Sequence, residues 1–316
     1  MWAQDLVPGH YRHHQADLLI TLMDAWVLAP EMLEGMRVAH WMPIDCAPLS
    51  AMDRKILNEG HGRPVAMSQH GRRMLENAGY SPLFVPHGVD SAVFAPLPDR
   101  DAAREQMGFA GRFAIGINAA NQDAFRKGFS EQLEAFAEFA RAHPEALLLI
   151  HSRAQARQGT DLNALIAELG IPEGQVRLGD QYLIAAGLVG QSDLAQWYGA
   201  LDVLSNCSYG EGFGLAVLEA QACATPVIVT DCTAMTELCG DGWLVEGSRW
   251  WNRAHSAFWT KPSVPAITEA YEDAFALWQS GGLGAYRDKA RQFALAYDAD
   301  RVLTEHWQPV LEELAA

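Results

Sequence analysis

Short apolar runs alternate with amphipathic stretches along the first part of the chain. The pattern predicts strands within 15–28 and 36–45, a strand followed by an amphipathic helix in 63–80, and another strand at the start of 83–90. Strands that alternate with helices favour a parallel sheet in which the helices make the crossover connections. We therefore expect an α/β fold in this part of the chain.

The alternation restarts with greater regularity after a polar stretch at 94–112, which contains two prolines and is predicted to be a linker. The predicted strands of this second part lie within 112–120, 146–152, 175–180, 202–208, 226–231 and 242–246, with helices between them. This pattern predicts a doubly wound domain. We expect a first domain at 1–97, a second at 98–295, and a final helix at 296–316 that packs back on the first domain.

Composition narrows the class of protein. Of the 316 residues 49% are hydrophobic, and the formal net charge of −16 argues against binding to nucleic acid, which needs many lysines and arginines. The five cysteines form no C-x-x-C pair, so neither a disulfide framework nor a structural zinc site is expected. The first residues suggest no signal peptide and no long apolar span, and a cytoplasmic protein is the expectation.

The strongest candidate for chemistry is the segment 205–231, where a predicted strand ends in a glycine-rich turn that leads into a helix. Ligands of open α/β sheets bind beyond the carboxyl ends of the strands, and free N–H groups at a helix start favour a diphosphate. Glu211 and Glu219 are eight positions apart, which is about 12 Å along a helix. That span fits two carboxylates that hold a hexose and a ribose across a diphosphate, although either residue alone could be a solvated turn or helix residue.

A second candidate is the loop after the strand at 112–120. It carries Arg126 and Lys127, and the whole chain has only four lysines. Two cations at the mouth of a loop could neutralise a departing diphosphate. The alternative is an ordinary basic helix start, which would place positive charge against the helix dipole.

These segments resemble family 4 glycosyltransferases. The glycine-rich turn matches the E-x7-E signature of that family, usually written E-G-F-G-L-P-x-x-E-A, at Glu211, Gly212, Phe213, Gly214, Leu215, Glu219 and Ala220. Ala216 replaces the usual proline, and Ala224 stands where glycine is common. The loop with Lys127 is similar to the family's G-R-x-x-x-x-x-K-G element, with Asn121 in place of its arginine. Residues 83–96 are similar to the interdomain element V-P-x-G-V-D-x-x-x-F-x-P.

The resemblance implies a GT-B fold, in which two Rossmann-like domains face a cleft. It further implies transfer of a hexose, with retention at the anomeric carbon, from a UDP-, GDP- or ADP-sugar to a small-molecule, lipid or glycan acceptor, with no cofactor and no required metal. Glu211, Lys127 and Arg126 then become the catalytic candidates. The candidates for donor binding are Gly212, Phe213, Gly214, Leu215, Glu219, Asn121 and Tyr182. Tyr182 is a candidate to stack on the base, with a half-buried packing role as the alternative.

The front of the chain departs from the family. Only about 95 residues precede the predicted linker, and the family's glycine-rich opening loop has no counterpart, so the first domain is expected to be incomplete. A second hypothesis is therefore a nucleotide-sugar-binding subunit that depends on a partner or has no activity, with self-association through an exposed sheet edge. His40 or Asp45 could face the sugar, with packing or a strand-end turn as the alternative.

Other polar clusters have simpler explanations. Asp99 with Asp101, and Asp298 with Asp300, fit the D-x-D pattern of metal-dependent transferases, but both pairs precede helical patterns and fit helix capping better. The histidine cluster near the start of the chain, at 10–14, is predicted to lie on the surface. The chain has no G-x-G-x-x-G, Walker A, H-E-x-x-H or G-x-S-x-G pattern, which removes several large enzyme classes.

Overall fold

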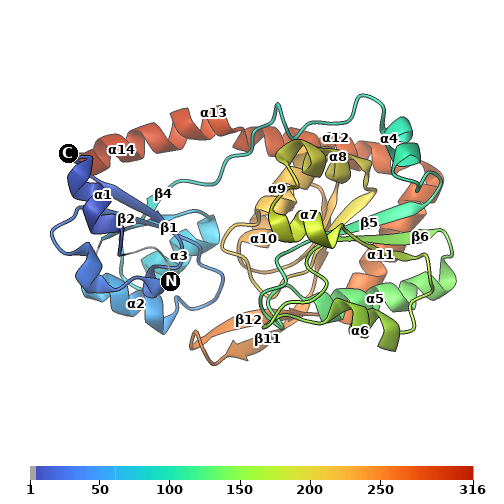
Figure 1. Ribbon diagram of the computed structural model, residues 1–316, viewed down its shortest axis with the longest axis horizontal. Helices are drawn as coiled ribbons and strands as arrows, with labels where there is room; N and C mark the ends of the chain where they lie inside the picture. The colour runs from blue at the N-terminus through green and yellow to red at the C-terminus, as the bar shows by residue number, and fades with distance from the viewer. Residues whose placement is uncertain (1–4, 61, 316) are drawn as a thin grey trace.

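The computed structural model describes residues 5–60 and 62–315 and shows two parallel β-sheets at opposite ends of the molecule (Figure 1). The first sheet is four-stranded, in the order β1-β2-β3-β4, and all of its neighbouring strands are parallel. Its strands are β1 (Leu19–Leu22), β2 (Val38–Met42), β3 (Arg63–Ala66) and β4 (Leu83–Phe84). Helices α1 (Val7–His13), α2 (Ala51–Asn58) and α3 (Gln69–Asn77) and two short 3-10 helices, η1 (Ala25–Val27) and η2 (Pro30–Leu33), belong to this part.

The second sheet has six parallel strands in the order β10-β9-β8-β5-β6-β7, which is the doubly wound order. The strands are β5 (Phe113–Asn118), β6 (Ala146–His151), β7 (Val176–Leu178), β8 (Val203–Asn206), β9 (Val227–Thr230) and β10 (Gly242–Val245). The helices are α5 (Phe129–Ala142), α6 (Leu162–Glu168), α7 (Gln181–Ala186), α8 (Gln191–Ala200), α9 (Leu215–Ala222) and α10 (Thr233–Leu238). The predicted α/β class with parallel sheets is confirmed, and the strands predicted in this part of the chain are all present.

The predicted linker at 94–112 contains a helix, α4 (Arg100–Gln106), which begins where the Asp99 side chain accepts a hydrogen bond from the Ala102 N–H at 2.9 Å. Two arginines of α4 bind the buried Asp202 at the start of β8, so the helix packs on the second sheet. Of the predicted linker, therefore, only residues 94–98 connect the two sheets without packing as a helix on the second one.

An antiparallel hairpin was not predicted from the sequence. It consists of β11 (Gly247–Asn252) and β12 (Ala257–Pro262) and projects beyond the second sheet (Figure 1). Its second strand pairs with a loop of the first part: the Ala47 N–H donates to the Phe258 carbonyl at 3.0 Å, and the Phe258 N–H donates to the Ala47 carbonyl at 2.8 Å. The hairpin thus joins the two sheets by backbone hydrogen bonds.

The C-terminal helices run from the second sheet back to the first (Figure 1). They are α11 (Val264–Ser280), α12 (Leu283–Ala294), η3 (Leu295–Tyr297), α13 (Ala299–Val302), the π-helical turn η4 (Leu303–Trp307) and α14 (Gln308–Ala315). Val302, Val310 and Leu314 pack into one apolar cluster with residues of β2, β3 and β4. Where the chain passes Gly88, an added Cβ would lie 2.8 Å from the Ala299 Cα, so the glycine of the interdomain element permits this close crossing.

Ala224 provides a prediction about stability. It follows α9, is 8% exposed and has a φ of +59°, in the left-handed region where a glycine is favoured. We expect Ala224→Gly to raise the free energy of unfolding by about 1 kcal/mol, because the strain of the left-handed alanine is relieved. Urea denaturation measures the change. The matched control is Ala222→Gly in the last turn of α9, which should lower stability, and an equal loss at both positions would contradict the prediction.

Candidate active site

A cavity of about 520 Å³ lies between the carboxyl ends of the two sheets. From the first part of the chain it is lined by Leu22, Met23, Asp24, Trp26, Pro43, Asp45, Met67 and His87. From the second part it is lined by Asn118, Ala119, Ala120, Asp123, Arg126, Lys127, Asn206, Glu211, Gly212, Phe213, Gly214, Leu215, Ala216, His255 and Trp259. Both sheets therefore contribute walls, as expected for a ligand site at the carboxyl ends of parallel strands.

The three predicted catalytic residues meet in this cavity, and four of the predicted donor-binding residues, Gly212, Phe213, Gly214 and Leu215, also line it. The Lys127 Nζ lies 2.5 Å from one carboxylate oxygen of Glu211, and the Arg126 guanidinium donates to the other at 3.2 Å. The Ser208 hydroxyl donates to the same carboxylate at 2.8 Å. Burial alone would raise the pKa of Glu211, but the two cations outweigh it and the pKa falls below its ordinary value. Glu211 is therefore a buried carboxylate held ionised by two cations.

Close backbone packing brings these side chains together. Gly128 has a φ of +59°, and an added Cβ would lie 2.2 Å from the Cys207 carbonyl oxygen, so no other residue fits here without a shift of the loop. The Tyr209 N–H donates to the Arg126 carbonyl at 2.8 Å. These contacts hold the loop after β5 against the loop after β8, which places the two cations beside Glu211.

The glycine-rich turn has a role that the sequence did not indicate. Gly212 and Gly214 line the cavity, and their predicted contacts with a donor remain predictions. In addition, a Cβ at Gly210 would lie 2.1 Å from the Asp45 carbonyl oxygen, and one at Gly212 would lie 2.4 Å from the Pro43 Cα. These two glycines therefore let the loop after β2 pack against the turn. Gly214 is required for another reason, its φ of +117° at the start of α9.

Thr233, at the start of α10, was not predicted to belong to the site. Its φ is +50°, an uncommon value for a β-branched residue. Its hydroxyl accepts a hydrogen bond from the Glu211 N–H at 3.1 Å. The strained residue thus fixes the backbone of the glutamate that pairs with both cations, as strained residues at functional sites often do.

Glu219 lies on α9, half-buried, outside the lining of this cavity. The Tyr198 hydroxyl donates to its carboxylate at 2.9 Å, and the Asn118 amide donates to the Tyr198 oxygen at 2.6 Å. Burial raises the pKa of Glu219 to about 7, although the bond from Tyr198 acts in the opposite direction. Because Asn118 lines the cavity, this chain of hydrogen bonds connects Glu219 to it.

Asn121 and Tyr182, which were also predicted to bind the donor, lie outside the lining of the main cavity. Asn121 is buried, and its amide bonds to both backbone groups of Thr160 and to the Arg153 carbonyl at 2.7 to 3.0 Å, which fixes a neighbouring loop. Tyr182, on α7, is 74% exposed, so the half-buried packing alternative is wrong. Neither lines the main cavity, and their predicted contacts with a donor remain predictions.

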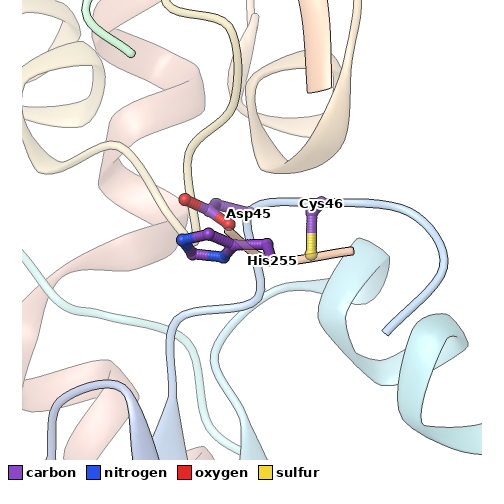
Figure 2. A group of neighbouring side chains, drawn as sticks. All are labelled: Asp45, Cys46 and His255. Atoms are coloured by element: carbon purple, nitrogen blue, oxygen red, sulfur yellow. The ribbon is translucent and has the colours of Figure 1, made fainter. Parts of the chain in front are cut away.

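His40, in β2, and Asp45, just after β2, were both candidates to face the sugar, but only Asp45 lines the cavity. His40 is fully buried, and its ring shares a hydrogen bond of 2.8 Å with the Thr21 hydroxyl. Asp45 lines the cavity, and burial raises its pKa to about 6 against the lowering effect of Arg126. Figure 2 shows Asp45 beside His255 and Cys46, with the polar atoms of all three within 4.8 Å of one another. The sequence reading missed His255, because it comes from the unpredicted hairpin.

The remaining polar clusters have structural roles. Asp298 accepts hydrogen bonds from the Asp300 and Arg301 N–H groups, so both D-x-D aspartates cap helices as the capping interpretation predicted. His10, His13 and His14 are exposed, and the rings of His10 and His14 stack at 5.8 Å. The five cysteines are free, three of them buried and two partly exposed.

Comparisons with known proteins show which sequences this chain resembles. Residues 106–256 match the family model described as Glycosyl transferases group 1. A D-inositol 3-phosphate glycosyltransferase from Kineococcus radiotolerans is 33% identical over 181 residues, which cover 54% of this chain and 40% of that relative. The chain thus spans less than half the length of this curated relative. Within the described residues, none of the helices has an apolar stretch long enough to traverse a bilayer.

Solved structures show the same fold. Sucrose-phosphate synthase from Thermosynechococcus elongatus superposes with a TM-score of 0.75 at 18% identity, covering 99% of this chain and 77% of that one. HepE from Anabaena in complex with UDP-glucose superposes with a TM-score of 0.72 at 17% identity, and the match covers 97% of this chain and 82% of that one. The two parallel sheets with a cavity between their carboxyl ends form the GT-B fold that these structures share. Over residues 106–256 the chain is similar to the group 1 glycosyl transferases.

Proposed function

We propose that this protein transfers a hexose from a nucleotide-diphosphate sugar to an acceptor hydroxyl, with retention at the anomeric carbon. The observation that carries the proposal is the buried Glu211 carboxylate between Lys127 and Arg126, in a cavity formed by both sheets. Two features support it: the match to the group 1 family, and the UDP-glucose bound by HepE, whose fold is similar. A cytoplasmic location remains part of the proposal.

In this mechanism Lys127 and Arg126 stabilise the negative charge of the departing diphosphate, helped by N–H groups at the start of α9. Glu211 orients the hexose by accepting hydrogen bonds from its hydroxyls. The bond from the anomeric carbon to the diphosphate breaks, the acceptor oxygen bonds to the same face, and its proton passes to the leaving phosphate. Two protein cations supply the charge neutralisation that a divalent ion gives elsewhere, so we propose that no metal is required.

A second candidate is a nucleotide-sugar-binding subunit that acts with a partner chain. The observation that favours it is the edge strand β1, which pairs only with β2 among the described residues and leaves Ile20 and Leu22 37% and 53% exposed. An open edge of this kind can be covered by another chain. Both candidates would bind the nucleotide sugar at the same site, but only the transferase would release or transfer the sugar by itself.

The proposed donor site predicts a pH-dependent affinity for nucleotides. In titration calorimetry with UDP, GDP and ADP, we expect one of them to bind in the micromolar range. The Glu219 carboxylate, with its pKa raised to about 7, should accept stronger hydrogen bonds from the ribose when it is ionised than when it is protonated. Affinity should therefore be highest above that pKa and fall as the pH drops from about 8 to about 6. Glu219→Gln should weaken binding about 10-fold and flatten the pH profile.

The control is Glu168→Gln, which alters an exposed glutamate at the end of α6 and should change nothing. Hydrolysis of the matching nucleotide sugar then separates the two candidates. Slow release of sugar supports the transferase, and binding without any turnover supports the partner-dependent subunit. If no nucleotide binds, both candidates fail. An unchanged pH profile in Glu219→Gln would remove Glu219 from the site.

A further inference from the structure

We propose that Asp24, Asp45 and His255, with Trp26 and Trp259, form a subsite for an uncharged, hydroxyl-rich sugar ring in the part of the cavity wall formed by the first sheet and the hairpin. The inference rests on the proposed function, because it identifies a substrate feature of the same cavity. All five residues line that cavity. The source of the sugar ring is either the acceptor or the hexose of the donor, and the experiment below separates the two.

Three segments far apart in the sequence build this subsite. Asp24 and Trp26 follow β1, Asp45 follows β2, and His255 and Trp259 belong to the hairpin. The His255 ring lies between two indoles, with centroids 6.0 Å from Trp26 and 5.5 Å from Trp259. Figure 2 shows the Asp45 carboxylate next to the His255 imidazole. Carboxylates and an imidazole framed by aromatic faces are the groups that bind the hydroxyls and the apolar face of a sugar ring.

The subsite is fixed before any ligand binds. The His255 carbonyl accepts a hydrogen bond from the Ala51 N–H at 3.3 Å, and the Asn252 side chain accepts from the Ala254 and His255 N–H groups. The pairing of Ala47 with Phe258 holds the same hairpin against the loop that carries Asp45. Backbone contacts from both parts of the chain thus position the side chains, which lowers the ordering cost of binding.

Charge decides against a phosphorylated ligand. The subsite has two carboxylates, whereas both the lysine and the arginine of the cavity lining, Lys127 and Arg126, are already bound to Glu211 and face the proposed diphosphate. A phosphate monoester carries nearly two negative charges and would meet Asp24 and Asp45 with no free lysine or arginine beside it. Hydroxyl groups, in contrast, donate hydrogen bonds to carboxylates.

Within the part of the chain that the structure describes, two indole N–H groups of the cavity lining have no regular hydrogen bond. The Trp26 indole N–H is buried without a hydrogen-bond partner among the described residues, and that of Trp259 faces Asp45 without a regular hydrogen bond. A divalent ion is a poorer fit. The Cys46 thiol donates to the Pro48 carbonyl at 3.5 Å, burial raises its pKa, and Arg126 acts electrostatically on Asp45.

The test compares matched acceptors that differ by one phosphate: myo-inositol with D-inositol 3-phosphate, fructose with fructose 6-phosphate, and glucose with glucose 6-phosphate. We expect transfer to an unphosphorylated member to exceed transfer to its phosphorylated partner by about 10-fold or more in kcat/KM. Asp45→Asn should weaken binding of the sugar ring in the subsite by about 10-fold, seen either in the KM of the acceptor or in the affinity for the nucleotide sugar. The Kd of the nucleoside diphosphate should stay unchanged. Asp273→Asn, at an exposed position of α11, is the control.

The two sources of the sugar ring give different results. If the acceptor occupies the subsite, Asp45→Asn raises the KM of the acceptor and leaves the affinity for the nucleotide sugar unchanged. If the donor hexose occupies it, the variant weakens binding of the nucleotide sugar but not of the nucleoside diphosphate. An Asp45→Asn variant that changes neither quantity would overturn the inference. Preference for phosphorylated acceptors, combined with unchanged affinity of this variant for the nucleotide sugar, would overturn it as well. Failure of the proposed function is distinct, because the wild-type protein would then bind no nucleoside diphosphate.

Discussion

Glu211→Gln is expected to lower kcat for sugar transfer by about 100-fold or more while nucleoside diphosphate binding is retained or becomes tighter. The carboxylate accepts bonds from Lys127, Arg126 and Ser208 in the ligand-free protein. In the proposed mechanism it then orients the hexose. Glutamine keeps the shape but loses the charge and one acceptor oxygen, so the hexose should be held less firmly at the reacting position.

Glu211→Gln is expected to lower kcat but not the affinity for nucleoside diphosphate, and the reason is electrostatic. Glu211 pairs with both cations, so in the proposed mechanism it competes with the diphosphate for them, and a carboxylate beside a diphosphate repels it. Removal of the carboxylate charge therefore leaves Lys127 and Arg126 free to bind the diphosphate. The affinity gained from the hexose, measured as the ratio of nucleotide-sugar to nucleoside-diphosphate affinity, should disappear in the variant.

Calorimetry with both ligands and a transfer assay measure the two effects separately. Glu168→Gln is again the matched control, because its side chain is exposed and lies outside the cavity lining. If Glu211→Gln abolished nucleoside diphosphate binding, Glu211 would belong to the diphosphate site. If it left kcat unchanged, Glu211 would have no part in catalysis.

The sequence predicted the part of the site that depends on local pattern. Each strand of the second sheet is a short apolar run, and each candidate loop follows such a run, so the proximity of Glu211 to Lys127 followed from the rule that ligands gather at the carboxyl ends of strands. The capping aspartates Asp99 and Asp298 were also recognisable, because a cap depends only on its own helix.

Features that depend on contacts between distant segments were not predictable in this way. The hairpin β11–β12 is rich in tryptophan but has no turn dipeptide of the common hairpin type, and its place is set by the pairing of Ala47 with Phe258. Trp259 and His255 are placed in the site by that pairing and by the hydrogen bonds from Ala51 to His255 and from Thr260 to Tyr209. The packing role of Gly210 and Gly212, whose missing side chains make room for Asp45 and Pro43, also depends on a distant segment.

The exposure of Tyr182 has a comparable origin. Its helix α7 has no buried residue, so a pattern that looked partly apolar does not pack against the sheet. The burial of a short helix depends on what covers it, and its own six residues carry little of that information. Asn121 shows the converse, because a polar loop residue became buried by bonding to Thr160 and Arg153.

Asp202→Ala is expected to have the largest effect on stability of any substitution considered. Asp202, at the start of β8, is 2% exposed, and its carboxylate accepts bonds from Arg100 at 2.6 Å, from Arg104 at 3.2 Å and from the Ala114 N–H at 2.8 Å. It therefore ties α4, the strand β5 and the end of α8 into one arrangement. Arg287 adds a third cation at the carbonyls of Gly199 and Leu201.

Removal of the carboxylate would leave buried guanidinium groups without this partner and the Ala114 N–H without an acceptor. Loss of one member of a buried ion pair costs about 3 to 5 kcal/mol, and we expect a decrease of that size in the free energy of unfolding, measured by urea denaturation. Asp202→Asn keeps the shape and an acceptor oxygen for Ala114, so it should lose less, whereas the exposed Asp273→Ala on α11 should change stability by less than about 0.5 kcal/mol. The cavity proposed to bind the nucleotide lies at the other end of β8, so a folded Asp202→Asn variant should keep the wild-type Kd for nucleoside diphosphate. Equal stability of Asp202→Ala and Asp273→Ala would mean that the helix carbonyls alone satisfy the arginines and that Asp202 is not what holds α4 to the sheet.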